Sequence, residues 1–228
     1  SAYGNKTSVH FYATAGMRLL PKKRQQQLYV EAYNWFAKHP KWQLIEARTI
    51  SGVEEGVFGW LGAYYKFGKL YQESLGFIEI GGASMQVVFP VMDYTDINSD
   101  NIVTITANGQ QFKLFAHSFL GMGANKVKEQ FTNNDTCFPI GFPMPNGQQG
   151  IGDALSCEHD IMSVLNANDY ISNTVKLPQQ RNPASTWYTV GVVGQITQKS
   201  PLGFTNKFVT DEFFNKSNLT YCQQNWHY

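Results

Sequence analysis

The chain has 228 residues, of which 43% are hydrophobic and 15% are charged, and its formal net charge is +1. This composition excludes a disordered chain, and the near-neutral charge gives no sign of a nucleic-acid-binding surface. No apolar run approaches the length of a membrane-spanning helix, about eighteen residues, although association with a membrane stays open. The length suffices for one large or two modest domains with a buried core.

The first half of the chain predicts alternating strands and helices. Period-two alternation marks the strands, and apolar residues at helical spacing mark the helices. Such alternation favours an α/β fold over an all-β sandwich. The expected elements are a strand over 9–12, a helix from Pro21 to about His39, a strand over 42–50, a helix capped by Ser51 over 51–68, and a strand pair around Gly81 and Gly82.

The second half begins with a hairpin over residues 101–119, since Asn108-Gly109 is a strong turn signal between two alternating runs. The other expected segments are a helix over 120–131, an irregular Asn/Gly/Pro-rich excursion over 133–160, a loop over 177–185 and a strand over 186–193.

Two polar clusters lie where these early elements begin or end. Thr14 and Gly16 follow the first strand, and on their own they are typical of an ordinary turn. Glu54 and Glu55 begin the helix after Ser51, where acids usually interact with the helix dipole. One acid of this pair, directed inward, would suit a general base.

A third cluster lies in residues 76–89, where Glu79 stands between two isoleucines and is followed by Gly81 and Gly82. A buried carboxylate is costly unless it is paired or near a metal. Adjacent glycines let backbone N–H groups approach an anion. A phosphate with its cation explains both features, whereas the plain alternative is a tight β-turn with an incidental acid.

Together the clusters supply a carboxylate base, a glycine-rich phosphate turn and hydroxyl groups. These are the groups that hydrolysis of a phosphoanhydride by water requires, because that reaction depends on charge stabilisation and a positioned nucleophile.

Three long motifs carry a family resemblance. Residues 13–18 (ATAGMR), 50–65 (ISGVEEGVFGWLGAYY) and 76–89 (GFIEIGGASMQVVF) resemble the second, third and fourth sequence regions of the apyrase, or nucleoside triphosphate diphosphohydrolase, family, in the same order. The resemblance covers about residues 7–157. Weaker supporting matches are residues 116–127, 136–142 and 150–157.

The resemblance implies an α/β, actin-like or ribonuclease-H-like, two-lobed fold with the site in the cleft, incomplete in this chain. We expect residues 1–75 to be part of the first lobe and residues 76–228 most of the second. By similarity, Glu55 is the general base on the attacking water. The other implied site residues are Ser84 and Gln86, which help to hold the water, Thr14, which lies close to it, and the backbone of Gly81, Gly82, Ala83 and Ser84, which wraps the terminal phosphate.

The resemblance also implies a divalent cation, Mg²⁺ or Ca²⁺. Glu79 matches a carboxylate that binds this cation through its water shell, although most relatives have the shorter Asp there. Mg²⁺ retains several waters, so the longer side chain still reaches it. Trp60 matches an aromatic position that we interpret as structural support.

The implied activity is hydrolysis of nucleoside tri- and diphosphates to monophosphate and phosphate. The alternatives are an exopolyphosphatase-like or guanosine-pentaphosphate phosphatase, a catalytically silent nucleotide-binding lobe, and a structural domain without a ligand. No residue is assigned to stacking on the base; the aromatic residues available for it are Trp187, Tyr188, Tyr221, Trp226 and Tyr228.

One motif of the family is not found. Its first region is an Asp-x-Gly-Ser/Thr loop that cradles phosphate from the opposite lobe, and the chain also ends before the family's last region. We therefore expect a partner segment, from the same protein or a separate chain, that supplies this loop. The chain by itself is expected to show little turnover.

The three cysteines allow one disulfide. The resemblance favours Cys137–Cys157, which closes a loop of about twenty residues and contributes roughly 3 kcal/mol in the chain-entropy model; reduced thiols are the alternative. A disulfide suits a secreted or extracytoplasmic protein. Sequons for N-glycosylation, which suit a secreted eukaryotic protein, occur at Asn5, Asn134, Asn215 and Asn218.

Overall fold

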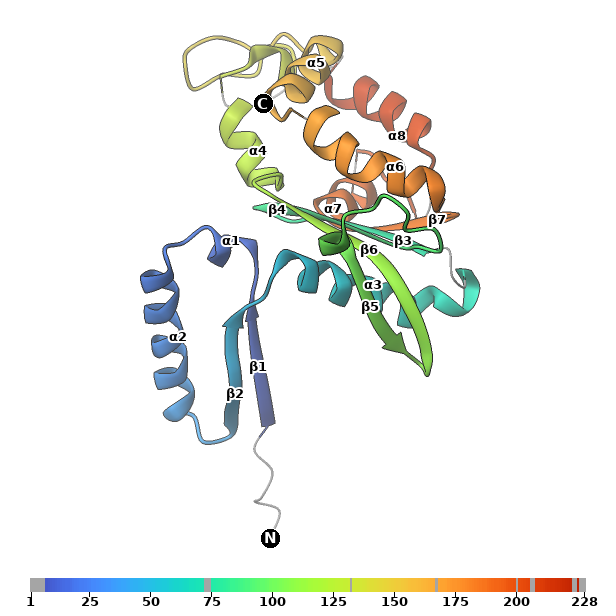
Figure 1. Ribbon diagram of the computed structural model, residues 1–228. Coiled ribbons are helices and arrows are strands. Elements are labelled where there is room, and N and C mark those ends of the chain that lie inside the picture. The colour runs from blue at the N-terminus through green and yellow to red at the C-terminus, as the bar shows by residue number, and fades with distance from the viewer. Residues whose placement is uncertain are drawn as a thin grey trace.

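The N-terminal part of the chain forms a small parallel sheet with one covering helix (Figure 1). β1 (Thr7–Ala13) pairs with β2 (Trp42–Thr49), and α2 (Lys22–Ala37) connects them after the short α1 (Ala15–Arg18). These elements confirm the strand, helix and strand expected from the sequence. The computed structural model describes residues 7–71, 75–131, 133–166, 168–199, 201–205, 208–222 and 225.

A second sheet has the strand order β5-β6-β4-β3-β7. The pair β3–β7 is parallel and the others are antiparallel. Asn108 and Gly109 both have positive φ, 51° and 78°, as the expected two-residue hairpin turn requires. The strands are β3 (Leu75–Ile80), β4 (Ser84–Pro90), β5 (Ile102–Ala107), β6 (Gln110–Leu120) and β7 (Thr186–Gly191).

Helices cover both faces of this sheet, which confirms the α/β class (Figure 1). On one face Trp60 of α3 is fully buried against Phe77, and its indole N–H donates to the Leu75 carbonyl over 2.8 Å, the structural role expected for it. On the other face Phe119 belongs to a core against which Val175 of α6 packs. The remaining helices are α3 (Gly52–Tyr71), α4 (Ala124–Phe131), α5 (Ala154–Val164), α6 (Asn173–Arg181), α7 (Val192–Gln198) and α8 (Thr210–Ser217).

Three expectations about the second half were wrong in part. The loop expected over 177–185 begins as the end of α6, where burial of Pro178 offsets the hydrogen bond that a proline cannot donate. The strand expected over 186–193 ends at Gly191, whose positive φ of 75° turns the chain into α7. The excursion over 133–160 contains most of α5, begun by the Asp153 cap.

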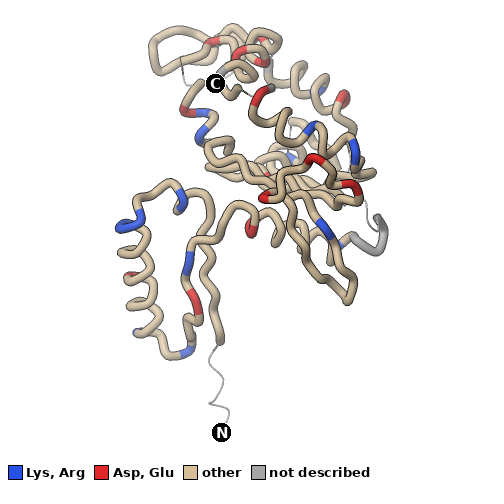
Figure 2. Tube along the Cα trace, in the orientation of Figure 1, with Lys and Arg blue, Asp and Glu red and all other residues tan. Residues whose placement is uncertain are grey.

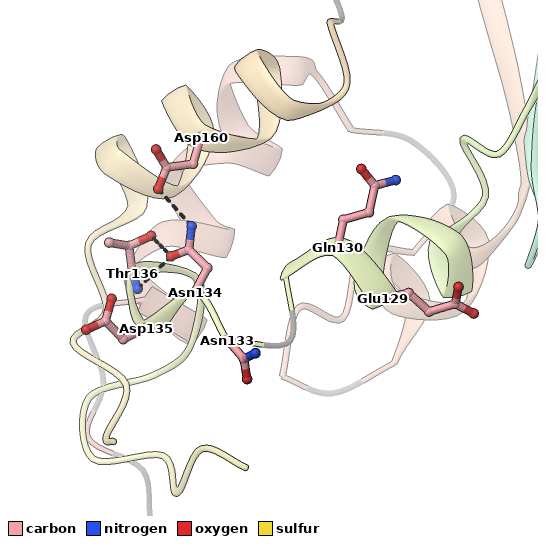
Figure 3. A pocket seen from close by; sticks show the side chains of 7 residues that line it. All are labelled: Glu129, Gln130, Asn133, Asn134, Asp135, Thr136 and Asp160. Atoms are coloured by element: carbon pink, nitrogen blue, oxygen red, sulfur yellow. Dashed lines mark hydrogen bonds between the residues drawn. The ribbon is translucent and has the colours of Figure 1, made fainter. Parts of the chain in front are cut away.

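The disulfide between Cys137 and Cys157 is confirmed, with 4.9 Å between the Cα atoms. Asn134 strengthens this region, because its amide donates to Asp160 over 2.7 Å and its side-chain oxygen accepts from Thr136 (Figure 3). A hollow of about 460 Å³ lies beside these residues. The Cys222 side chain and the Asn5 sequon lie outside the described residues.

Basic and acidic residues are interspersed along the chain (Figure 2). Among the described residues, no helix has both the length and the apolar character that crossing a bilayer demands. α3 connects the two sheets in sequence and packs on the larger one, and the division of the chain at residue 75 stays a prediction.

Candidate active site

The turn between β3 and β4 is held by the helix that packs against it. The N–H groups of Ala124 and Asn125, at the start of α4, donate to the carbonyls of Gly81 and Gly82 over 2.9 Å. A Cβ on Gly123 would overlap with the backbone of Ala83, so glycine is required there for the close approach of α4. The turn is therefore built with its carbonyls directed at α4.

The same turn offers free donors. The N–H of Gly81 donates to the Ser84 carbonyl over 3.0 Å, so it is already used. Among the described residues, the N–H groups of Gly82 and Ala83 have no acceptor. A Cβ on Gly81 would meet only the Ser84 carbonyl at 3.5 Å, an ordinary contact. Packing therefore does not require glycine at position 81. The space beside the turn is open, and the free N–H groups of Gly82 and Ala83 can bind an anion there.

Glu54 and Glu55 have different environments. Glu54 forms a capping box with Ser51: the Ser51 N–H donates to its carboxylate over 2.8 Å, and the Glu54 N–H donates to the Ser51 hydroxyl over 3.1 Å. Arg48 pairs with the same carboxylate over 2.8 Å, and these hydrogen bonds lower the pKa of Glu54 to about 2. Glu54 therefore stabilises the start of α3 and is a permanent anion at neutral pH.

Glu55 points toward the larger sheet. Its Oε2 atom accepts from the Arg18 guanidinium over 2.9 Å and from the Gln86 amide over 3.1 Å, and its side chain is only 13% exposed. Glycine makes this approach possible, because a Cβ on Gly52 would overlap with the Ser118 hydroxyl. A Cβ on Gly56 would lie 2.9 Å from a methyl group of Val88. The two glycines that flank the acidic pair thus bring the first turn of α3 onto β4 and β6.

A polar row crosses the sheet beneath Glu55. The strand register places Glu79 opposite Gln86, and Gln86 opposite Ser118. The fully buried Gln86 amide donates to Ser84 Oγ over 2.6 Å and to Ser118 Oγ over 3.1 Å. Its Oε1 atom is buried without a hydrogen-bond partner among the described residues. That orphaned acceptor is suited to a small donor such as water.

In the described part of the chain, the Glu79 carboxylate has no partner that offsets the cost of its partial burial. No hydrogen bond or ion pair reaches its carboxylate among the described residues. Burial, and secondarily the negative charge of Glu55, raise the pKa of Glu79. Glu55 and Glu79 are close enough for their charges to interact, and the described residues contain no group of three or more His, Cys, Asp or Glu side chains that could hold a metal ion. Two carboxylates near a phosphate turn fit a hydrated Mg²⁺, which needs few protein ligands.

The sequence reasoning missed Arg18. Besides Glu55, its guanidinium donates to Ser84 Oγ over 3.2 Å and to the Ile50 carbonyl over 3.1 Å, and the side chain is 14% exposed. A single basic residue that ends an otherwise uncharged motif was the available signal. Its charge offsets that of Glu55 and fixes Oε2 in place.

A cavity of about 550 Å³ brings most of the predicted residues together. Glu79 and Gln86 do not line it; Gln86 reaches it through Ser84 and Glu55, and Glu79 lies beside Gln86 in the row. The lining residues are Thr14, Ala15, Gly16, Leu19, Leu20, Glu55, Gly81, Gly82, Ala83, Ser84, Asn125, Lys126 and Glu129.

Two of the aromatic residues left unassigned, Trp187 and Tyr188, are partly buried and pack against the two cores. Trp187 packs edge-on against Phe89, and Tyr188 packs against Phe67. Tyr221 is partly exposed, and Trp226 and Tyr228 lie outside the described residues. None of them is assigned to stacking on a base.

Comparison with known proteins identifies the family. A sequence model of the GDA1/CD39 (nucleoside phosphatase) family matches residues 2–228. The chain belongs to this family. The apyrase resemblance of its three motifs is thereby confirmed.

Individual members of the GDA1/CD39 family are similar over different shares of the chain. Human ectonucleoside triphosphate diphosphohydrolase 3 is 27% identical over 96% of this chain. A nucleoside-diphosphatase of Caenorhabditis elegans is 27% identical over 70%, and a Golgi apyrase of Saccharomyces cerevisiae is 34% identical over 54%. The chain spans 51%, 37% and 22%, respectively, of these relatives.

Proposed function

We propose that this site hydrolyses nucleoside tri- and diphosphates to monophosphate and phosphate by direct attack of water. One observation carries the proposal: the Glu55 carboxylate and the unpaired N–H groups of Gly82 and Ala83 line the same cavity. A base and an anion cradle that face one space are the minimum that phosphoanhydride hydrolysis requires. The family and the names of its members support this chemistry.

Glu55 acts as general base through Oε1. Arg18 and Gln86 both bind Oε2, and among the described residues Oε1 has no hydrogen-bond partner. Oε1 therefore accepts the proton as the water oxygen bonds to the terminal phosphorus. The bond from that phosphorus to the bridging oxygen breaks, and its electron pair stays on that oxygen, which leaves as part of the shortened nucleotide.

Ser84, Gln86 and Thr14 position the water. Ser84 Oγ lies between Arg18 and Gln86 at the wall of the cavity, and the unpaired Oε1 of Gln86 provides a further acceptor behind it. Thr14, the residue between β1 and α1, lines the same cavity. Holding a nucleophile in this way removes part of the entropic barrier to reaction.

Glu79 holds the divalent cation, Mg²⁺ or Ca²⁺, through water. Its carboxylate is half-buried, is unpaired among the described residues, and interacts unfavourably with the charge of Glu55. A bound cation would remove the repulsion between the two acids. When bound, the cation supplies neutralisation of negative charge on the phosphate oxygens.

A partner segment completes the phosphate clamp. β1 and β2 form a two-stranded parallel sheet in which Phe11 is 43% and Ile45 is 47% exposed, although parallel sheets are ordinarily covered on both faces. The relatives are longer than this chain. We propose that a further segment pairs with this sheet and supplies the Asp-x-Gly loop. We also propose a secreted or lumenal location, which the disulfide and the ecto- and Golgi names of relatives support.

The test compares the two adjacent acids in the complete protein. Glu55→Gln is expected to lower kcat at least about 100-fold, the usual range for loss of a general base. Glu54→Gln changes the same charge one residue away and is expected to change kcat less than about twofold. Equal effects of the two variants on kcat would reject the role of Glu55.

The substrate class is tested by phosphate release from ATP, ADP and inorganic polyphosphate. Release from both nucleotides is expected. Hydrolysis of polyphosphate alone would replace the proposal with the exopolyphosphatase alternative, and nucleotide binding without release would leave a silent binding lobe.

A further inference from the structure

The candidate cavity has one basic side chain. Among its lining residues Lys126 is the sole Lys, Arg or His, whereas Glu55 and Glu129 are acids. The guanidinium of Arg18 does not line the cavity and is already bonded to Glu55, Ser84 and the Ile50 carbonyl. A phosphate chain carries several negative charges, so it requires a positive partner that the base and its arginine do not supply.

The backbone fixes Lys126 close to the phosphate turn. Its N–H donates to the Gly82 carbonyl over 3.2 Å, and it lies in the first turn of α4. The α4 N–H groups that face the turn are thus already bonded to its carbonyls, and the charge left for a ligand is the side-chain ammonium.

That ammonium is held by Glu129. Lys126 Nζ donates to both carboxylate oxygens, over 3.0 and 2.8 Å. The two side chains are 38% and 62% exposed, and an ion pair this exposed is weak and readily exchanged. Glu129 lines both this cavity and the hollow beside the disulfide, and its side chain extends from α4 away from Asn134 and Asp160 (Figure 3).

We propose that Lys126 binds the phosphate chain of the substrate and that Glu129 occupies its ammonium when no phosphate is bound. The phosphate oxygens displace the Glu129 carboxylate, so Lys126 determines affinity for the phosphate chain independently of the nucleoside. This assignment rests on the proposed function of the cavity.

The experiment measures the dissociation constant of inorganic tripolyphosphate with Mg²⁺ by titration calorimetry. Lys126→Gln is expected to weaken binding about tenfold, the scale of one lost charged contact. Glu129→Gln is expected to tighten binding about threefold, because it removes the competing carboxylate. Lys128→Gln is the matched control: it removes the same charge from the same helix, does not line the cavity, and is expected to change binding less than about twofold.

The expected changes in the dissociation constant have opposite signs for Lys126→Gln and Glu129→Gln. This distinguishes phosphate binding from a structural role, since loss of a stabilising ion pair would affect both variants alike. Equal effects of Lys126→Gln and Lys128→Gln, weaker binding by Glu129→Gln, or no binding by the unmodified protein would overturn the proposal. Phosphate release by the unmodified protein separates the two hypotheses. Tripolyphosphate binding that depends on Lys126 in an unmodified protein that releases no phosphate from ATP or ADP would refute the proposed hydrolysis and keep this inference.

Discussion

Glu79 is the acid of the site whose surroundings least favour a negative charge. Burial and the nearby Glu55 raise its pKa above the ordinary 4.5, so the folded protein favours its neutral form. Its contribution to stability is complete below pH 4.5 and is lost as the pH rises through the raised pKa. Without a cation, ionisation of this side chain as the pH rises therefore destabilises the fold.

We predict that Glu79→Gln raises the free energy of unfolding at pH 7 without a cation by about 1 kcal/mol, a typical scale for one substitution. The difference from the unmodified protein should vanish below pH 4.5, where both side chains are neutral. Added Mg²⁺ should raise the melting temperature of the unmodified protein and not that of the variant. Urea unfolding and thermal scans measure these effects, and a variant less stable than the parent at pH 7 would contradict this account.

At this scale the sequence predicted the residue types but not their partners. The pattern of two adjacent acids showed that one of them was available for catalysis, and the family resemblance selected Glu55. Neither indicated that Arg18, 37 residues away, lies against it, because that contact depends on how α1 and α3 pack. The unpaired Oε1 of Gln86 was likewise inaccessible to sequence reasoning.

Among the elements, α3 has adjacent residues with separate structural and proposed catalytic roles. Its first turn carries a capping box and an ion pair through Glu54, while the next residue faces the cavity. The pKa of Glu54 is lowered to about 2, so its stabilising contribution is present above pH 4.5 and is lost as the pH falls toward 2.

We predict that Glu54→Gln lowers the free energy of unfolding by about 1 kcal/mol at pH 7, because the Arg48 pair is lost while glutamine still accepts from the Ser51 N–H. This penalty should shrink as the pH is lowered below 4.5 and be small near pH 2.5. Chemical unfolding of both proteins across this range is the measurement. A penalty that stays constant with pH would show that the carboxylate charge does not act here.

Elements with strong local signals were predictable and the others were not. The turn Asn108-Gly109 and the capped start of α3 are specified by a few neighbouring residues. α6 is not, because it contains a proline, and its Val175 packs against core residues that are distant in sequence. The same holds for the start of α7, where Gly191 must pass close to the Ile80 carbonyl of the adjacent strand.

For the whole molecule, the site depends on how two sheets are joined. Arg18, from the unit built on β1 and β2, reaches Glu55 on α3 and Ser84 on β4. Stacking of Tyr12 on Phe58, with ring centres 6.1 Å apart, is a second contact between the same parts. The alternation of strands and helices predicted the α/β class, but the strand order and the mixed direction of the larger sheet came only from the structure.

The central claim is that the base and the phosphate turn act on one ligand. A crystal structure of the protein soaked with Mg²⁺ and inorganic phosphate tests it directly. We predict phosphate at the N–H groups of Gly82 and Ala83, with a water about 3 Å from Glu55 Oε1. Phosphate bound only elsewhere, such as in the hollow beside the disulfide, or a phosphate at the turn separated from Glu55 by protein atoms, would contradict the account.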